Sequence, residues 1–243
     1  MYETLHCVAL RTIKHDDRTS VLSAWSAEHG RIGIVMPAGA GREARRRRAL
    51  TMPLALFEGV CVSRPGRDLI QLRDLRPWAM TSSVHANPVK AAMALFLADV
   101  LDGVLRTSQP DEHLTHFLHT GVQALHALTR PAAVANFHLW FLRVLAALTG
   151  IEPDYGSWSP GAVFDMNEGV FRATPPLHGR WLAPDDAMAV RMLGRLTMRS
   201  MAHVGLSREQ RGRILEGIID YYSLHGMPAA SAARSLEILR ALF

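Results

Sequence analysis

The sequence predicts an α+β protein, with a small β-barrel over residues 1–80 and an all-α domain over residues 81–243. In the first part, apolar and polar residues alternate over short segments that end at turns rich in Gly, Pro or Asp, which is typical of half-buried strands. Beyond residue 80, apolar residues recur every three or four positions, the period of amphipathic helices. With 243 residues, 49% of them hydrophobic, both parts can bury a core.

Five strands account for the first part: residues 4–13, 19–27, 31–37, 54–62 and 69–75. Gly30 closes the short hairpin connection Glu28-His29-Gly30, at a position that favours a left-handed backbone. Five short antiparallel strands suit a closed barrel, and the OB fold is the five-stranded barrel best known for binding oligonucleotides. An SH3-like barrel would give a similar pattern, so the pattern alone leaves this choice open.

The helical part opens at Asn87-Pro88, where Asn suits the N-cap and Pro the first helical position. A second helix is expected over residues 110–129. The segment over residues 131–149 is apolar on almost every side and stops at Gly150. We therefore expect it to be a buried helix at the centre of the helical domain.

Residues 151–183 are rich in Gly, Pro and Trp and show little periodicity, which predicts an ordered irregular insertion. Helices resume over residues 184–204 and again from Ser207, which forms a capping-box pair with Gln210. A last helix is expected over residues 232–243.

A basic segment follows the third expected strand. Gly39 and Gly41 allow a flexible backbone, and five arginines come next, Arg42 and the run Arg45, Arg46, Arg47 and Arg48. We expect a flexible loop whose guanidinium groups contact phosphates. The alternative is a solvated arginine face on a short helix over residues 43–50.

Further basic residues of the barrel could extend a groove that follows a phosphate backbone: Arg11, Lys14, Arg18, Arg31, Arg64 and Arg67. Three aromatic residues of the barrel, Trp25, Phe57 and Trp78, could stack on bases, although a buried position in the barrel suits each of them better.

Charge and cysteine content narrow the class of protein. The net charge of +5 favours an anionic partner, nucleic acid first and a membrane surface second. Cys7 and Cys61 lie too far apart in sequence for a zinc knuckle and suggest no disulfide framework, so a reducing cytoplasm is expected. No signal peptide is visible and the apolar run over residues 91–98 is too short to span a bilayer, so we expect a cytoplasmic, nucleoid-associated protein without a membrane segment.

Enzyme and metal motifs are not found, so we expect neither a catalytic residue nor a cofactor. The chain has no phosphate-binding P-loop, and the spacing around Ser159 is one residue too long for a nucleophile elbow. His113, His116 and His119 recur every third residue, with His126 further on, but no second motif supports a closed metal site. Histidines on an amphipathic helix explain this pattern better.

Two separated stretches resemble the bacterial RecO family of recombination mediators. The first is CVALRTIKHDDRTSVLSAWSAEHGRIGIVMPAGAGRE, which contains the hairpin residues 27–31 and the start of the glycine-basic segment over residues 39–48. The second is YYSLHGMPAASAARSLEILRALF, with matching residues at Tyr221, Tyr222, His225, Ser235 and Leu239. The order of barrel and helices also fits this family across nearly all of the chain.

The resemblance implies a non-enzymatic role in recombinational repair. Members of the family bind single- and double-stranded DNA, anneal complementary strands, and work with RecR to load RecA onto DNA coated by single-strand-binding protein (SSB). The resemblance also implies that the helical domain binds the acidic, apolar C-terminal tail of SSB, for which Arg130 and Arg143 are the candidates. The rival interpretation is a helical protein-interaction scaffold that does not bind DNA and uses the barrel as a docking surface; a hydrolase is a more distant third.

The sequence departs from the family pattern at one point. Many members carry a four-cysteine zinc site near the insertion at residues 151–183, where this chain has no cysteine. The pieces Phe164-Asp165 and Glu168-Gly169 resemble the remains of that segment without its ligands. We therefore expect a zinc-free member in which four aromatic residues pack the region, Trp158, Phe164, Phe171 and Trp181.

Overall fold

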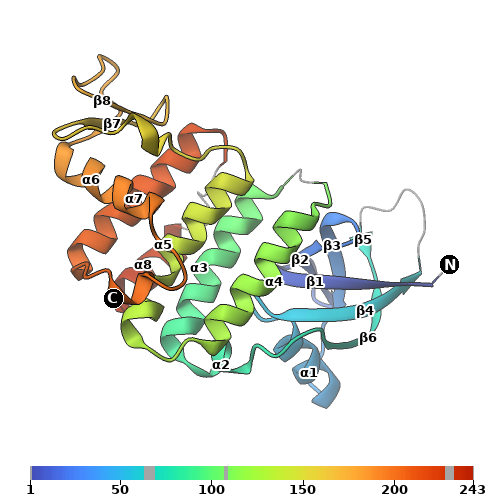
Figure 1. Cartoon of the computed structure of the whole chain (residues 1–243). Coiled ribbons are helices and arrows are strands. Elements are labelled where there is room, and N and C mark those ends of the chain that lie inside the picture. The colour runs from blue at the N-terminus through green and yellow to red at the C-terminus, as the bar shows by residue number, and fades with distance from the viewer. Residues whose placement is uncertain (1, 63–68, 107–108, 228–232, 243) are drawn as a thin grey trace. The chain divides into compact units, whose positions relative to one another are not determined.

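The computed structural model describes residues 2–62, 69–106, 109–227 and 233–242 (Figure 1). It is an α+β structure, as predicted, and it divides into two compact units. The first unit reaches from the N-terminal strand to Ala127 and also contains the C-terminal helix α8 (Ala233–Leu242). The second unit holds the chain in between, from Leu128 onward. The domain boundary expected near residue 80 stays a prediction.

The first unit is built on a curled, mixed sheet of six strands in the order β5-β3-β2-β1-β4-β6. Its strands are β1 (Tyr2–Lys14), β2 (Thr19–Ser26), β3 (Gly30–Pro37), β4 (Leu56–Val62), β5 (Leu69–Ile70) and β6 (Leu72–Pro77). The fifth strand that we expected is therefore two strands, separated only by Gln71. β5 pairs in parallel with β3, whereas β6 pairs antiparallel with β4. The two strands therefore lie at opposite edges of the sheet order, although only one residue separates them in sequence.

A β-bulge interrupts the pairing of β4 with β6. The register between β4 and β6 shifts between Glu58 and Val60, and Asp74 takes a positive φ of 54° opposite the shift. Gly59 lies opposite the bulge, where a Cβ atom would stand 2.8 Å from Leu75 Cδ2 and 3.1 Å from the backbone oxygen of Arg73. A larger residue there would force Leu75 to move and would crowd the backbone of β6, so the position favours glycine.

The barrel core forms from the inward half of each alternating strand. Ile32, Ile34 and Met36 of β3 are buried, as their period-two spacing predicts, and Gly30 has the expected left-handed φ of 70°. Cys7 and Cys61 are free thiols within this core, and burial raises the pKa of both.

Five helices belong to the described part of the first unit: α1 (Arg42–Leu50), α2 (Ser82–Ala86), α3 (Pro88–Val104), α4 (Glu112–Ala127) and α8. Asn87 caps α3 as predicted, by accepting hydrogen bonds from the next two backbone N–H groups beyond Pro88. α8 packs on α3, where its residues Ser235 and Leu239 are buried and Ser235 hydrogen-bonds to Asp99 of α3.

Polar contacts join the sheet to these helices. Asp102 of α3 is buried and accepts hydrogen bonds from Ser23 of β2 and, at 2.5 Å, from Arg31 Nη2 of β3. Trp25 is fully buried and its indole N–H donates to Thr115 Oγ1 of α4 at 2.9 Å. The outer face of β1–β3 is therefore fixed on α3 and α4 by hydrogen bonds with directional requirements.

The second unit combines helices α5 (Pro131–Leu148), α6 (Pro184–Gly194) and α7 (Arg208–Leu224) with a small sheet of β7 (Val163–Asp165), β8 (Val170–Arg172) and β9 (Trp181–Leu182). The insertion that we expected to be irregular thus contains a three-stranded sheet in the order β8-β7-β9. Strands this short carry too few residues to show a period of two, so the pattern did not reveal them.

The helix expected over residues 184–204 ends ten residues early. Gly194 passes so close to Tyr155 that a Cβ atom would lie 2.7 Å from the ring. Beyond it, Thr197 and Ser200 bond to each other's backbone and form a turn, which competes with helix formation. A short 3-10 helix (Met201–His203) follows, and the capping box of Ser207 and Gln210 opens α7 as predicted.

α5 is the core helix of the second unit. It is the one helix among the described residues that is long and apolar enough to cross a membrane by length and composition, with a mean hydropathy of 1.4. However, 56% of that window is buried inside the protein, which is typical of a core helix in a water-soluble fold. This agrees with the central position that its sequence predicted.

Candidate nucleic-acid interface

The basic segment after β3 is a helix, α1 (Arg42–Leu50), so the expectation of a flexible loop was wrong and the alternative of a short helix was right. Gly41 is the N-cap with an extended backbone, φ −72° and ψ −178°, and takes no left-handed conformation. Arginine and alanine are good helix formers. Glu43 in the first turn, with Arg47 and Arg48 in the last, also suits the helix dipole.

Three of the arginines hold α1 on the sheet. Arg46 Nη2 donates to the backbone oxygen of Leu75 in β6 at 2.9 Å. Arg48 Nη1 donates to Gly39 O at 2.8 Å, and Arg47 reaches Pro37 O at 3.5 Å. These bonds to neutral carbonyl groups orient the helix and do not cancel the charges of Arg47 and Arg48, whereas Arg46 also forms an ion pair with Glu43 of the same helix at 3.6 Å.

The two remaining arginines of α1 point their charge at solvent. Arg42 and Arg45 lie one turn apart and are exposed, and their guanidinium groups form no ion pair or hydrogen bond with the residues that the structure describes. Arg73 is a third exposed cation, on the strand β6 against which α1 packs. Arg73 was not among the residues predicted from the sequence. Its position beside Leu72, in a strand whose apolar and polar residues alternate, would have indicated that its side chain faces solvent.

The other predicted DNA-binding residues differ in how available they are. Arg11 and Arg18 are exposed. Burial raises the pKa of Asp99, and Arg11 lies near enough to that carboxyl to oppose part of the rise. Lys14 forms an exposed ion pair with Asp17 at 2.7 Å. The guanidinium of Arg31 is bound to Asp102. The remaining two candidates, Arg64 and Arg67, lie outside the described residues.

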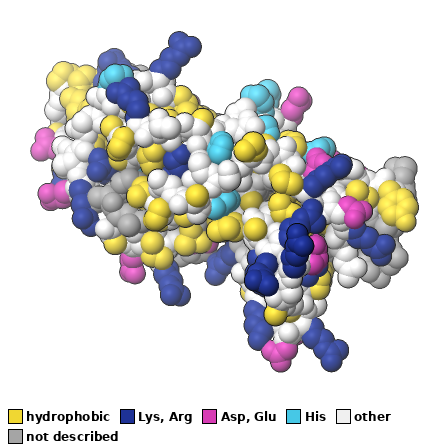
Figure 2. All heavy atoms as spheres, turned by 90° about the horizontal axis from the view of Figure 1, so that it is seen from below, with side chains coloured by type: hydrophobic (Ala, Val, Ile, Leu, Met, Phe, Trp, Pro, Cys, Tyr) yellow, Lys and Arg dark blue, Asp and Glu magenta, His cyan; other side chains and the backbone are white. Residues whose placement is uncertain are grey.

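Figure 2 looks from the side on which α1 lies in Figure 1. Many Lys and Arg side chains project from this face, with a smaller number of acidic side chains between them. A surface of this kind attracts a polyanion through its summed field more than through single contacts.

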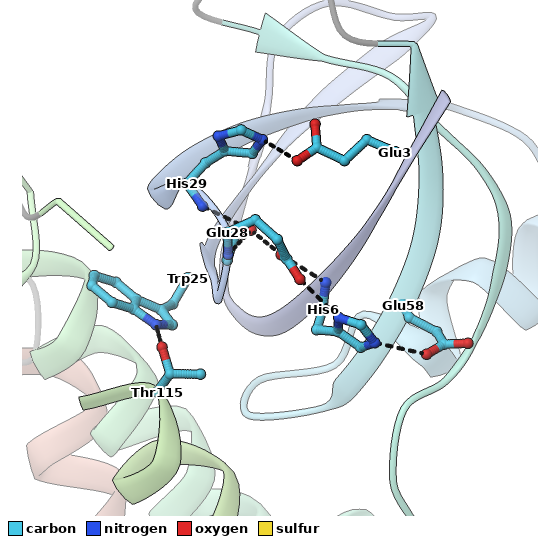
Figure 3. Close-up of polar contacts among 8 residues, drawn as sticks. Glu3, His6, Trp25, Glu28, His29, Glu58 and Thr115 are labelled. Atoms are coloured by element: carbon cyan, nitrogen blue, oxygen red, sulfur yellow. Dashed lines mark hydrogen bonds and ion pairs between the residues drawn. The ribbon is translucent and has the colours of Figure 1, made fainter. Parts of the chain in front are cut away.

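Histidine and glutamate side chains on the curled sheet form a cluster in which they pair with one another (Figure 3). His6 lies between Glu28 and Glu58, with nitrogen–oxygen distances of 2.7 and 3.3 Å, and His29 pairs with Glu3 at 3.0 Å. Burial alone would raise the pKa of Glu28, but hydrogen bonds from His6 and Ser26 hold it below its usual range. These contacts stabilise the barrel wall.

The three candidate stacking aromatics are not open to bases in this structure. Trp25 and Phe57 are fully buried. Trp78 is half-buried between the rings of His6 and His119, with centroid distances of 5.1 and 4.3 Å. Burial beside these rings lowers the pKa of His119, as do the charges of His116 and His6.

The second unit contains an apolar pocket that brings one of the two tail-binding candidates into place. Arg143 of α5 lies on its lining together with aromatic and aliphatic residues from α5, α6, α7 and the small sheet, including Tyr155, Phe164, Leu193 and Tyr222. The guanidinium of Arg143 contacts Glu152 Oε1 at 2.7 Å. Arg130 is exposed at the N-terminal end of α5 and is not part of this lining.

A structural zinc ion does not fit the second unit. The insertion contains no cysteine, and the two thiols of the chain are buried in the barrel core. Throughout the part of the chain that the structure describes, no three His, Cys, Asp or Glu side chains are grouped so that they could hold a metal ion. Trp158, Phe164 and Phe171 pack this region as expected, whereas Trp181 is half-exposed on β9.

The curated proteins to which this chain is similar all come from one family. No family model matches the chain. The DNA repair protein RecO of Bacteroides fragilis is 30% identical over 237 residues, which cover 97% of each chain. The chain belongs to the RecO family. DNA repair proteins RecO of Porphyromonas gingivalis and Phocaeicola vulgatus are 29% and 28% identical, again over 97% of each chain.

Membership of the RecO family confirms the resemblance carried by the two terminal stretches. The names of these relatives place the RecO family in DNA repair. The aligned region covers nearly the whole chain and therefore extends over both compact units.

Proposed function

We propose that this RecO-family chain is a non-catalytic, cytoplasmic DNA-binding mediator of recombinational repair. In this proposal the curled sheet acts as an OB-fold barrel, binds single- and double-stranded DNA, and anneals complementary strands. The chain would also help RecR to load RecA onto SSB-coated DNA. The observation that carries the proposal is the exposed charge of Arg42, Arg45 and Arg73 on α1 and β6, which no described acidic side chain pairs with, in a chain whose relatives are DNA repair proteins.

The proposed binding is electrostatic. Arginines that contact phosphates release condensed counterions, so affinity falls as the salt concentration rises and depends little on sequence. α1 suits this mode because three of its arginines fix its position while two present free guanidinium groups. Annealing follows when phosphate charge on two strands is screened while the base edges stay open for pairing.

The pocket in the second unit supports a site for the SSB tail. An acidic, apolar peptide needs apolar walls and a cation at the rim, and the lining of this pocket combines both in Leu193, Tyr155 and Arg143. Glu152 already occupies the guanidinium of Arg143. We expect a carboxylate of the tail to replace Glu152 there, since an exposed ion pair of this kind is weak and exchanges readily.

Fluorescence anisotropy of a labelled single-stranded oligonucleotide, measured from about 50 to 200 mM salt, tests the DNA proposal. We expect tight binding at low salt that weakens steeply, together with faster annealing of complementary strands. Binding of a tail peptide that is unaffected by salt, with no binding of DNA at any salt concentration, would instead identify an interaction scaffold. In the peptide assay, Arg143→Ala should weaken binding while Arg130→Ala should not.

A further inference from the structure

The small sheet of the second unit surrounds a buried carboxylate. Asp165 is the last residue of β7, and its side chain is only 1% exposed. The turn over residues 166–169 and strand β8 follow it, and the connection over residues 173–180 then leads to β9. An ionised group in such a position is costly unless its oxygen atoms are fully hydrogen-bonded.

Four donors from three segments meet this requirement. Asp165 Oδ1 accepts hydrogen bonds from the backbone N–H groups of Asn167 and Glu168 at 3.0 and 3.2 Å. Arg172 Nε of β8 donates to Oδ2 at 2.8 Å. His178 Nε2 lies 3.2 Å from Oδ1.

His178 is itself oriented for this contact. Its other ring nitrogen, Nδ1, accepts a hydrogen bond from the backbone N–H of Arg180 at 3.1 Å. The neutral tautomer with a proton on Nε2 satisfies both contacts at once. Arg172 and His178 therefore hold both ends of residues 173–177, the first part of this connection, in which the side chain of Leu177 is fully exposed.

We infer that the carboxylate of Asp165 is the ordering centre of this small sheet, and that it takes the place of a structural metal ion. A structural metal holds separate segments by gathering anionic and neutral ligands around a cation. Here the signs are reversed, because one anion gathers a guanidinium, an imidazole and two backbone N–H groups. Such charge-assisted bonds are shorter and stronger than neutral ones. These bonds order the module, by which we mean the small sheet β7–β9 with its two connections, without any cysteine ligand.

The protonation of Asp165 should control the order of the module. Burial alone would raise the pKa of Asp165, but the bonds from Arg172 and the backbone of residues 167 and 168 hold it below its usual range. The stabilisation is therefore present above the pKa of an unfolded aspartate and is lost as the pH falls through the lower, folded value. Other ionisable groups near the centre are His178, Arg172 and His225, whose Nε2 lies 3.0 Å from Met166 O.

Hydrogen exchange of the full chain tests the inference. Asp165→Asn keeps the shape of the side chain but removes its charge, and we expect amide exchange over residues 166–172 to accelerate about tenfold or more. Asp220→Asn is the matched control, because Asp220 is an exposed carboxylate of the same unit, on α7. Its exchange in the same segment should stay close to that of the unaltered chain.

Metal content and a chelator provide the second measurement. We expect the purified chain to hold less than about one tenth of a zinc ion per molecule, and a chelator to leave exchange over residues 166–172 unchanged. Stoichiometric metal whose removal accelerates exchange would overturn the inference, and so would an Asp165→Asn variant as protected as the original. If that variant does not fold, Arg172→Gln offers the same comparison, with faster exchange expected and unchanged exchange against the inference.

Discussion

Removing the two free cations of α1 should change how DNA binding depends on salt. Arg42→Ala with Arg45→Ala deletes two exposed guanidinium groups that hold no other part of the described structure. For single-stranded DNA each phosphate contact contributes about 0.7 to the slope of log K against log salt, so the double variant should be shallower by about 1.4. At 0.1 M salt this corresponds to an affinity about 25-fold lower. Anisotropy at five or more salt concentrations measures both quantities.

The control variant carries the same charge change in the second unit. Arg195→Ala with Arg199→Ala also removes two exposed arginines, so a general effect of net charge would appear in both variants. A slope that is unaltered in the folded Arg42/Arg45 variant would refute the assignment of α1. An equal loss in the two double variants would show that DNA binding senses overall charge rather than this helix.

The remaining predictions concern stability, measured by urea denaturation. Asp102→Asn should destabilise the first unit by about 3 kcal/mol, because it leaves Arg31 beside a neutral group in a mostly buried site, whereas Lys14→Ala removes an exposed pair and should change little. Gly59→Ala should cost about 1–3 kcal/mol because the new methyl group overlaps β6, and an unchanged midpoint would contradict the tight approach seen there. Gly212→Ala, in open space within α7, should instead stabilise by about 0.5–1 kcal/mol.

Most of the fold could be predicted from the sequence where a segment was long enough to show the periodicity of a strand or a helix. β1, β2 and β3 and the helices α3, α5 and α7 follow from their spacing and caps, which are local signals. The division of the fifth strand at Gln71 was not readable, because it depends on pairing with β3 on one side and β4 on the other. Long-range pairing of this kind leaves no mark in the residues themselves.

The candidate site shows the same division between local and long-range information. The arginine run of α1 was identified, but its conformation was wrong because the glycines before it suggested flexibility. Arg31 and Asp102 are 71 positions apart in sequence, so residue spacing could not predict that the guanidinium of Arg31 binds to α3 rather than facing solvent. The network around Asp165 was also unseen, since a single buried aspartate resembles any turn residue in sequence.

The position of α8 constrains how this protein can be made in the cell. This helix is synthesised about a hundred residues after α4, yet its residues Ser235 and Leu239 are buried in the first unit, against α3. At a synthesis rate of roughly 5–20 residues per second, the interval between completion of α4 and arrival of α8 is on the order of ten seconds. During that time the face of α3 that α8 later covers stays open on the growing chain, where other apolar segments and chaperones can reach it.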